Sequence, residues 1–114
     1  MRLLMYRDEV VIQDIINAAR LVLDFVKGFD KEAFVDDWKT RSAVPYQISV
    51  IGEAVKRLSK EFRIEHTQIL WALIAGMRDN LVHGYDLIDW DEVWKTSTVD
   101  IPDLLDKFDL FMST

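Results

Sequence analysis

Apolar residues recur at helical spacing along most of the chain, which predicts an all-α fold. The first segment carries apolar residues at steps of three and four, namely Ile12, Ile15, Ala19, Val22 and Val26. Gly28 follows this stripe and is typical of a helix C-terminus, where a left-handed residue often ends the helix. We therefore predict a first helix at about residues 3 to 27.

A second long helix is predicted to end at about residue 63. Its core stripe consists of Ile48, Ile51, Val55, Leu58 and Phe62. A short helical turn capped by Asp30 precedes it and places Phe34 and Trp38 at an edge of the core. Pro45 must lie in the first turn of the second helix or kink it, because an interior proline removes a backbone donor. The pattern therefore leaves the start of this helix open.

Two further helices complete the pattern. The third is predicted to begin at the N-cap Thr67 and to end near His83, before Gly84. The fourth opens at Asp89, which forms a capping-box pattern with Glu92, and it continues to Met112 with a kink at Pro102.

The expected architecture is an up-and-down bundle of four main helices plus a short helical turn, forming one domain over residues 1–114. A second apolar strip lies off the predicted core stripes, and its members are Ile16, Leu23, Tyr46, Val50 and Ala54. This is more apolar surface than one small bundle needs, so a second copy of the chain is expected to cover it as a homodimer.

Charge and composition narrow the function classes. The net charge of −6 means that the protein surface as a whole repels nucleic-acid phosphates. An RNA-binding activity would therefore need a local basic patch. The absence of cysteine excludes disulfides, thiolate metal sites and a cysteine nucleophile. No apolar stretch approaches the roughly 18 residues of a membrane span, and the N-terminus lacks a signal-peptide pattern, so we expect no membrane association and a cytoplasmic location.

A polar cluster, GMRDNLVHGYD, occupies residues 76–86. No metal-ligand spacing, Gly-rich phosphate loop or dinucleotide fingerprint accompanies it, so no cofactor is expected. Arg78 and His83 would diverge by about 140° on one helix, and a two-fold axis could bring two copies of the pair into one cleft. A histidine that moves a proton and an arginine that holds phosphate suit attack of a ribose 2′-hydroxyl on the adjacent phosphate. Such a reaction would cut RNA without a metal.

A structural reading of the same residues stays open. Arg78 and His83 could cap the last carbonyls of the third helix and interact with its dipole. Asp79 could pair with Arg78, Asn80 could be a solvated helix residue, and Tyr85 could pack over the turn. His66 has the position of an ordinary surface or capping residue.

The sequence resembles the HepT-like branch of the HEPN ribonuclease domains. The resemblance rests on IGEAVKRLSKEF at 51–62, WALIAGMRDNLVHGYDLIDWDEVW at 71–94 and DIPDL at 100–104, in the family's order and spacing. It implies a dimeric helical bundle in which Arg78 and His83 are the catalytic pair, with Asp79 or Asn80 in support. Glu53, in the GEA block, points away from the core stripe and could orient a cleft residue, or it could be a solvated glutamate.

The resemblance also implies a partner and a mode of control. Members of this branch are typically metal-independent endoribonuclease toxins of type VII toxin-antitoxin systems, paired with a minimal nucleotidyltransferase (MntA-type) antitoxin. Tyr85 matches the tyrosine that this partner modifies with AMP. One departure is Asp79, because many relatives have asparagine directly after the motif arginine. The alternative function is a non-catalytic helical subunit that binds or scaffolds substrate for a nucleotidyltransferase.

Overall fold

The computed structural model describes residues 6–83 and 87–112, and only the backbone is described for residues 6, 82, 83, 111 and 112. The helices are α1 (Tyr6–Val26), α2 (Lys31–Asp36), α3 (Trp38–Lys56), α4 (Lys60–Glu65), α5 (Trp71–Ala75), α6 (Trp90–Lys95) and α7 (Ile101–Met112). A 3₁₀ turn, η1 (Asp79–Leu81), and a π-helical segment, η2 (Thr96–Asp100), lie among them. Two short strands, β1 (Val82–His83) and β2 (Leu87–Ile88), pair with each other. The predicted all-α fold class is confirmed.

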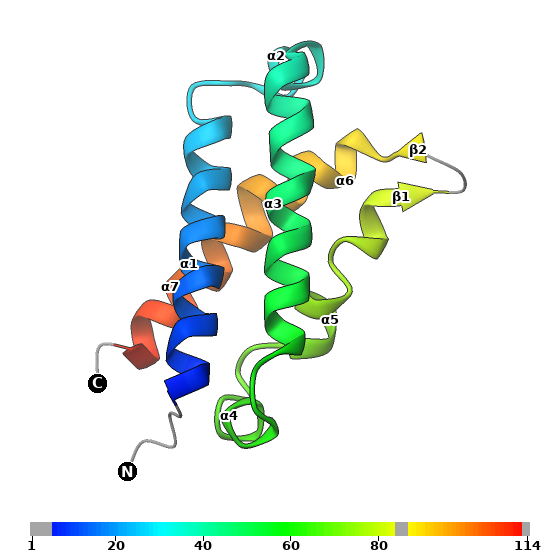
Figure 1. Cartoon of the computed structure of the whole chain (residues 1–114). Coiled ribbons are helices and arrows are strands. Elements are labelled where there is room, and N and C mark those ends of the chain that lie inside the picture. The colour runs from blue at the N-terminus through cyan, green and yellow to red at the C-terminus, as the bar shows by residue number, and fades with distance from the viewer. Residues whose placement is uncertain (1–5, 84–86, 113–114) are drawn as a thin grey trace.

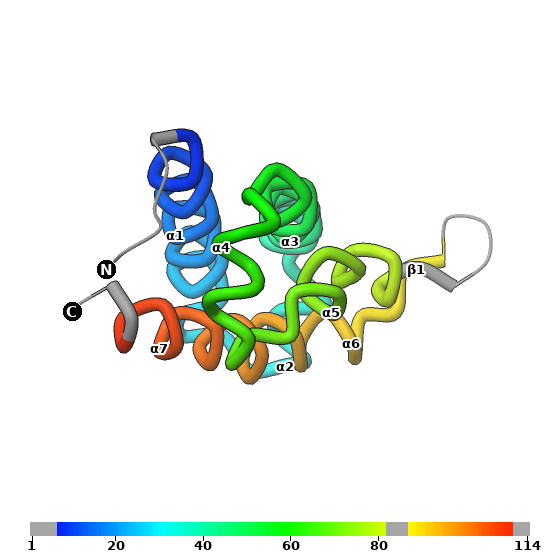
Figure 2. Tube along the Cα trace, turned by 90° about the horizontal axis from the view of Figure 1, so that it is seen from below, coloured from blue at the N-terminus to red at the C-terminus, as the bar shows by residue number. Residues whose placement is uncertain are grey.

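The bundle is built on the antiparallel pair α1 and α3, which lie side by side along their length (Figure 1). Helix α7 crosses this pair on one side, and α4 and α5 close the end of the bundle near the C-terminus of α3, as the view from below shows (Figure 2). The core between these elements includes fully buried aliphatic and aromatic side chains: Ile12, Ile15, Val22, Val44, Ile48, Ile51, Val55, Ile101 and Phe108. The apolar stripes of the sequence therefore face one another.

The caps at the start of the chain agree with the prediction. Gly28 has a positive φ of 83° just after α1, as expected for a helix that stops there. Asp30 accepts a hydrogen bond from the backbone N–H of Ala33 and caps α2. Phe34 of α2 is fully buried, but Trp38 is 68% exposed, so the expectation that both would cover a core edge holds for Phe34 alone.

Helix α3 starts earlier than Pro45 requires. Asp37 caps it by accepting hydrogen bonds from the hydroxyl and the backbone N–H of Thr40. These two bonds, the hydroxyl bond first, lower the pKa of the Asp37 carboxyl below its ordinary value of 3.8, against a smaller opposing effect of desolvation. Pro45 lies inside the helix. Ala54, predicted to lie on a second apolar strip, is fully buried and belongs to the core.

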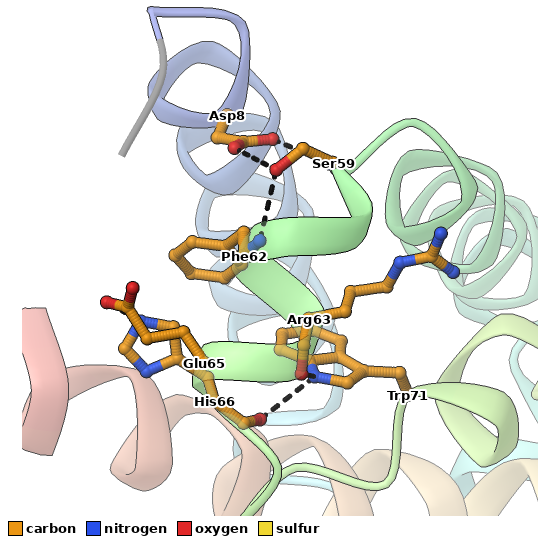
Figure 3. Close-up of polar contacts among 7 residues, drawn as sticks. All are labelled: Asp8, Ser59, Phe62, Arg63, Glu65, His66 and Trp71. Carbon is orange, nitrogen blue, oxygen red and sulfur yellow. Dashed lines mark hydrogen bonds and ion pairs between the residues drawn. The ribbon is translucent and has the colours of Figure 1, made fainter. Parts of the chain in front are cut away.

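The predicted second helix is wrong beyond Lys56, because the chain turns there and restarts as α4. Ser59 is the N-cap of α4 and accepts a hydrogen bond from the backbone N–H of Phe62. The buried carboxylate of Asp8, on α1, accepts from the Ser59 N–H at 2.8 Å and from its hydroxyl at 2.6 Å (Figure 3). A partner 51 residues away in sequence thus fixes the break, and periodicity could not reveal it.

The predicted N-cap at Thr67 is also wrong. Helix α5 begins at Trp71 after Leu70, which makes no capping hydrogen bond through its side chain. The indole N–H of Trp71 donates instead to the carbonyls of Arg63 at 3.1 Å and His66 at 2.9 Å (Figure 3). The start of α5 is therefore fixed to the end of α4 by one buried side chain.

The fourth predicted helix is divided into α6, η2 and α7. Asp89 caps α6 as predicted, accepting from the backbone N–H of Glu92. A π-helical turn precedes Pro102, the residue at which a kink was predicted, and the Ile101 N–H donates to the Thr96 carbonyl five residues earlier. Pro102 has no N–H and its ring would clash with the preceding turn, so a wider turn just before it relieves the conflict.

Gly52 allows α3 and α5 to approach closely. A Cβ atom at this position would lie 3.1 Å from the carbonyl oxygen of Ala75, the last residue of α5. That oxygen belongs to the backbone and cannot rotate away. The sequence leading out of α5 is consequently seated directly against α3.

We predict that Gly52→Ala destabilises the fold by about 1–3 kcal/mol, because the added methyl group pushes α5 away from α3. Gly76→Ala is the matched control, since its Cβ would meet the nearest atom at 3.4 Å. Urea unfolding of both variants measures the difference. Equal stability of Gly52→Ala and the unmodified chain would show that the helices have room to separate.

Candidate active site

The segment that follows α5 presents polar residues to solvent between two apolar anchors. Met77 and Leu81 are buried, at 5% and 1% exposure, and hold the backbone against the core. Arg78, Asp79 and Asn80, which lie between them, are exposed. Because Met77 and Leu81 pack into the core, the charged and amide groups of the three residues between them face the solvent.

The predicted third helix does not continue to His83. Helix α5 ends at Ala75 with Gly76 as its C-cap, a 3₁₀ turn covers Asp79–Leu81, and the chain then becomes extended. In the resulting hairpin, Val82 pairs with Ile88 and His83 pairs with Leu87. A hydrogen bond of 2.7 Å from the Asp89 N–H to the Leu81 carbonyl continues the pairing. Because Arg78 and His83 do not share a helix, the expected angle of 140° between them does not apply.

The hairpin projects from the body of the bundle beyond α5 and α6 (Figures 1 and 2). The backbone of His83 lies on β1, opposite Leu87, whose side chain is 68% exposed. The His83 side chain and the whole of Tyr85 lie outside the described residues. The sequence held a signal for this hairpin in the β-branched Val82, which favours a strand, and in the residue types of Gly84 and Asp86, which are common in turns.

Arg78 borders a shallow hollow of about 170 Å³ against the middle of α3. Its other lining residues are Pro45, Tyr46, Ser49, Leu81 and Ile88. Arg78 Nη1 lies 3.7 Å from Asp79 Oδ1, and the two side chains are 60% and 78% exposed. An exposed pair of this kind holds its partner weakly, so the guanidinium is accessible to another anion.

The other predicted supporting residues lie apart from this hollow. Glu53 is 71% exposed and its carboxylate lies 3.3 Å from Lys56 Nζ, as a solvated glutamate would. Asn80 lines a different groove, of about 220 Å³, formed by α5, α6, η2 and α7. His66, expected to be a surface or capping residue, is the C-cap of α4; its side chain is only 15% exposed, and its ring centroid lies 4.4 Å from that of Phe62.

Tyr46 and Ser49 are the neighbours of Arg78 that the sequence did not identify. Tyr46 was assigned to an apolar strip on α3, and nothing in its spacing linked it to residue 78. The approach of α5 to α3 at Gly52 brings the two segments together.

Within residues 6–83 and 87–112, no group of three or more His, Cys, Asp or Glu side chains could hold a metal ion. No helix in the same ranges is long and apolar enough to cross a membrane.

The model of the "Ribonuclease HepT-like" family matches residues 15–110, which contain α3, α5 and the Arg78 to His83 segment. The chain belongs to the HepT-like ribonuclease family. The match covers more than half of the chain, and it agrees with the resemblance noted in the sequence and with the helical fold.

Curated proteins include several relatives of this family member. One is a "Putative RNase" of Caldanaerobacter subterraneus subsp. tengcongensis, 39% identical over 82% of this chain and 83% of its own. Another is a "Probable ribonuclease HepT" of Thermococcus cleftensis, 39% identical over 86% and 89% of the two chains. A "Putative RNase" of Methanocaldococcus jannaschii is 35% identical over 86% and 84%. No solved structure matches the chain.

Stability measurements can separate the two readings of Arg78. If Arg78 caps the helix and interacts with its dipole, replacing it would lower the free energy of unfolding. If Arg78 only forms an exposed ion pair with Asp79, replacing it would change the free energy of unfolding little. We predict that Arg78→Ala and Asp79→Asn each change the free energy of unfolding by less than about 0.5 kcal/mol, as is usual for surface positions. A loss above about 1 kcal/mol in urea unfolding of Arg78→Ala would support the capping interpretation.

Proposed function

We propose that this HepT-like protein is a toxin that cuts RNA in the cytoplasm, acting as one domain without a metal ion. The observation that carries the proposal is the exposed guanidinium of Arg78 beside a hollow, in a segment matched by a ribonuclease family model. The relatives named as RNases support the same reaction class.

Arg78 and His83 divide the proposed chemistry. The His83 imidazole accepts the proton of a ribose 2′-hydroxyl, and the 2′-oxygen forms a bond to the adjacent phosphorus. The bond from phosphorus to the 5′-oxygen of the next nucleotide breaks, and that oxygen takes up a proton. Arg78 donates hydrogen bonds to the phosphate oxygens, where negative charge develops in the transition state. The products are a 2′,3′-cyclic phosphate and a free 5′-hydroxyl.

The proposed active form is a homodimer in which two hairpins meet at one cleft. A single chain supplies one Arg78 and one His83, and its hairpin projects from the bundle with Leu87 exposed. A second copy would cover this exposed residue and add a second histidine, so that one imidazole could accept a proton while the other donates one. Of the residues expected to support Arg78, Asp79 lies beside it and would do so, whereas Asn80 lines a different groove and Glu53 pairs with Lys56.

A minimal nucleotidyltransferase is the proposed antitoxin, and it would silence the toxin by attaching AMP to Tyr85. Residue 85 falls in the connection between β1 and β2, two residues after His83. A nucleotide attached there adds bulk and a negative phosphate next to the place where the RNA phosphate would bind.

The second candidate is a non-catalytic subunit of a nucleotidyltransferase complex. The observation in its favour is the 3.7 Å separation of Asp79 Oδ1 from Arg78 Nη1, because this carboxylate competes with a phosphate for the guanidinium.

We predict that the purified chain cuts single-stranded RNA in EDTA and that His83→Ala reduces the rate by at least about 100-fold, which is typical for loss of a general base. Cleavage is followed by gel analysis of a labelled oligonucleotide, and the cyclic phosphate is identified by mass spectrometry. His66→Gln is the control, since it changes the other histidine. Undiminished cutting by a folded His83→Ala chain would contradict the catalytic assignment.

Tyr85→Phe is predicted to remain toxic when the proposed nucleotidyltransferase partner is co-expressed, because it lacks the hydroxyl that accepts AMP. Intact-mass measurement should show AMP additions on the unmodified sequence and none on the variant. The control is expression of each chain without the partner, where both should be toxic. Full neutralisation of Tyr85→Phe together with AMP additions at another residue would exclude Tyr85 as the modification site.

A further inference from the structure

The outward face of α3 carries two exposed aromatic rings, those of Trp38 and Tyr46, at 68% and 66% exposure. Tyr46 is eight positions after Trp38. On an α-helix this offset places the two residues about 12 Å apart along the axis and about 80° apart in direction around it. The residues nearest to them on this face include Ser42 and Ser49, which are small and polar. Ser42, four residues from each ring, therefore lies between them, and Pro45 borders the hollow beside Tyr46.

Tyr46 continues the candidate active site. Its side chain, Ser49 and Arg78 line the same hollow of about 170 Å³. Trp38 lies two turns away toward the N-terminus of α3, and Lys39 Nζ lies 5.8 Å from the centroid of its ring. A ligand that reaches Arg78 along α3 would pass both rings.

The charge of this face differs from that of the rest of the protein. The sequence carries 20 acidic residues, but residues 38–52 and residues 66–78 contain none. These two acid-free stretches are the longest in the sequence, and they form α3 and α5, which pack together. Lys39 and Arg78 are cations of these stretches beside the two rings, whereas Arg41 is turned away, since it donates to the Val35 carbonyl and lies over the Trp90 ring. In a chain with a net charge of −6, the stretch of α3 that carries both rings thus has no carboxylate, and the carboxylate beside Arg78 is that of its exposed ion-pair partner Asp79.

We propose that this face of α3 binds single-stranded RNA, with the Tyr46 ring stacked on a base next to the phosphate held by Arg78. Trp38 stacks on a further base along the same strand. Exposed aromatic rings beside cations are the means by which proteins hold single strands without reading their sequence, since every base has a π face. A helical protein partner would need a continuous apolar row, and Ser42 and Ser49 interrupt one here. This inference rests on the proposed ribonuclease function.

Binding measured without cleavage tests the inference. In the full-length His83→Ala chain, we expect Tyr46→Ala to weaken the Kd for a labelled oligouridylate by about tenfold, as loss of one stacking ring does. Tyr46→Phe keeps the ring and should bind within about twofold of the parent. Ile64→Ala, on α4, removes a side chain of similar exposure at 65% and should leave the Kd unchanged. An oligonucleotide with the same backbone and abasic sites should bind all four chains equally.

Three results would overturn the inference, and they are distinguishable. If RNA is bound and cut normally while Tyr46→Ala matches the parent, the stacking role is wrong and the ribonuclease proposal survives. If the unmodified chain neither binds nor cuts RNA, both proposals fail. If Tyr46→Ala changes the mass of the assembly in light scattering, a second copy of the chain covers the ring and RNA does not.

Discussion

The close approach of α5 to α3 at Gly52 is the contact on which the candidate site depends. It leaves room for backbone only, so the chain that leaves α5 must run directly beside α3. Met77 and Leu81 then bury their side chains and leave Arg78 facing the hollow beside Tyr46. A bundle with a looser α3–α5 contact could carry the same residues without bringing the arginine against this helix face.

Much of the fold follows from local patterns. The apolar stripes predicted α1 and α3, and single residues marked boundaries correctly at Gly28, Asp30 and Asp89, since a cap acts within one turn of its own helix. Longer-range contacts were beyond this reasoning. The break after Lys56 depends on Asp8, and the start of α5 depends on an indole that reaches back to α4.

In the candidate site, too, features set by neighbouring residues in the sequence could be predicted, and features set by tertiary contacts could not. The polar cluster could be recognised as unusual from its composition, and its resemblance to the HepT-like family agrees with the family match. Its conformation was predicted wrongly, because the residues up to His83 were treated as one helix, whereas Leu81 ends a 3₁₀ turn and Val82–His83 form a strand that pairs with residues 87–88. Tyr46 was missed as a neighbour of Arg78 because no pattern in the sequence relates α3 to the end of α5.

The central claim is that Arg78 and His83 of two chains act together in one cleft, and subunit complementation tests it most directly. Two differently tagged chains, one with Arg78→Ala and one with His83→Ala, are co-expressed and the mixed dimer is isolated through both tags. The account predicts that each parent dimer is inactive, whereas the mixed dimer cuts RNA, though more slowly than the unmodified dimer, because its cleft retains one arginine and one histidine that must both accept and donate the proton. A mixed dimer as inactive as its parents would contradict the shared site.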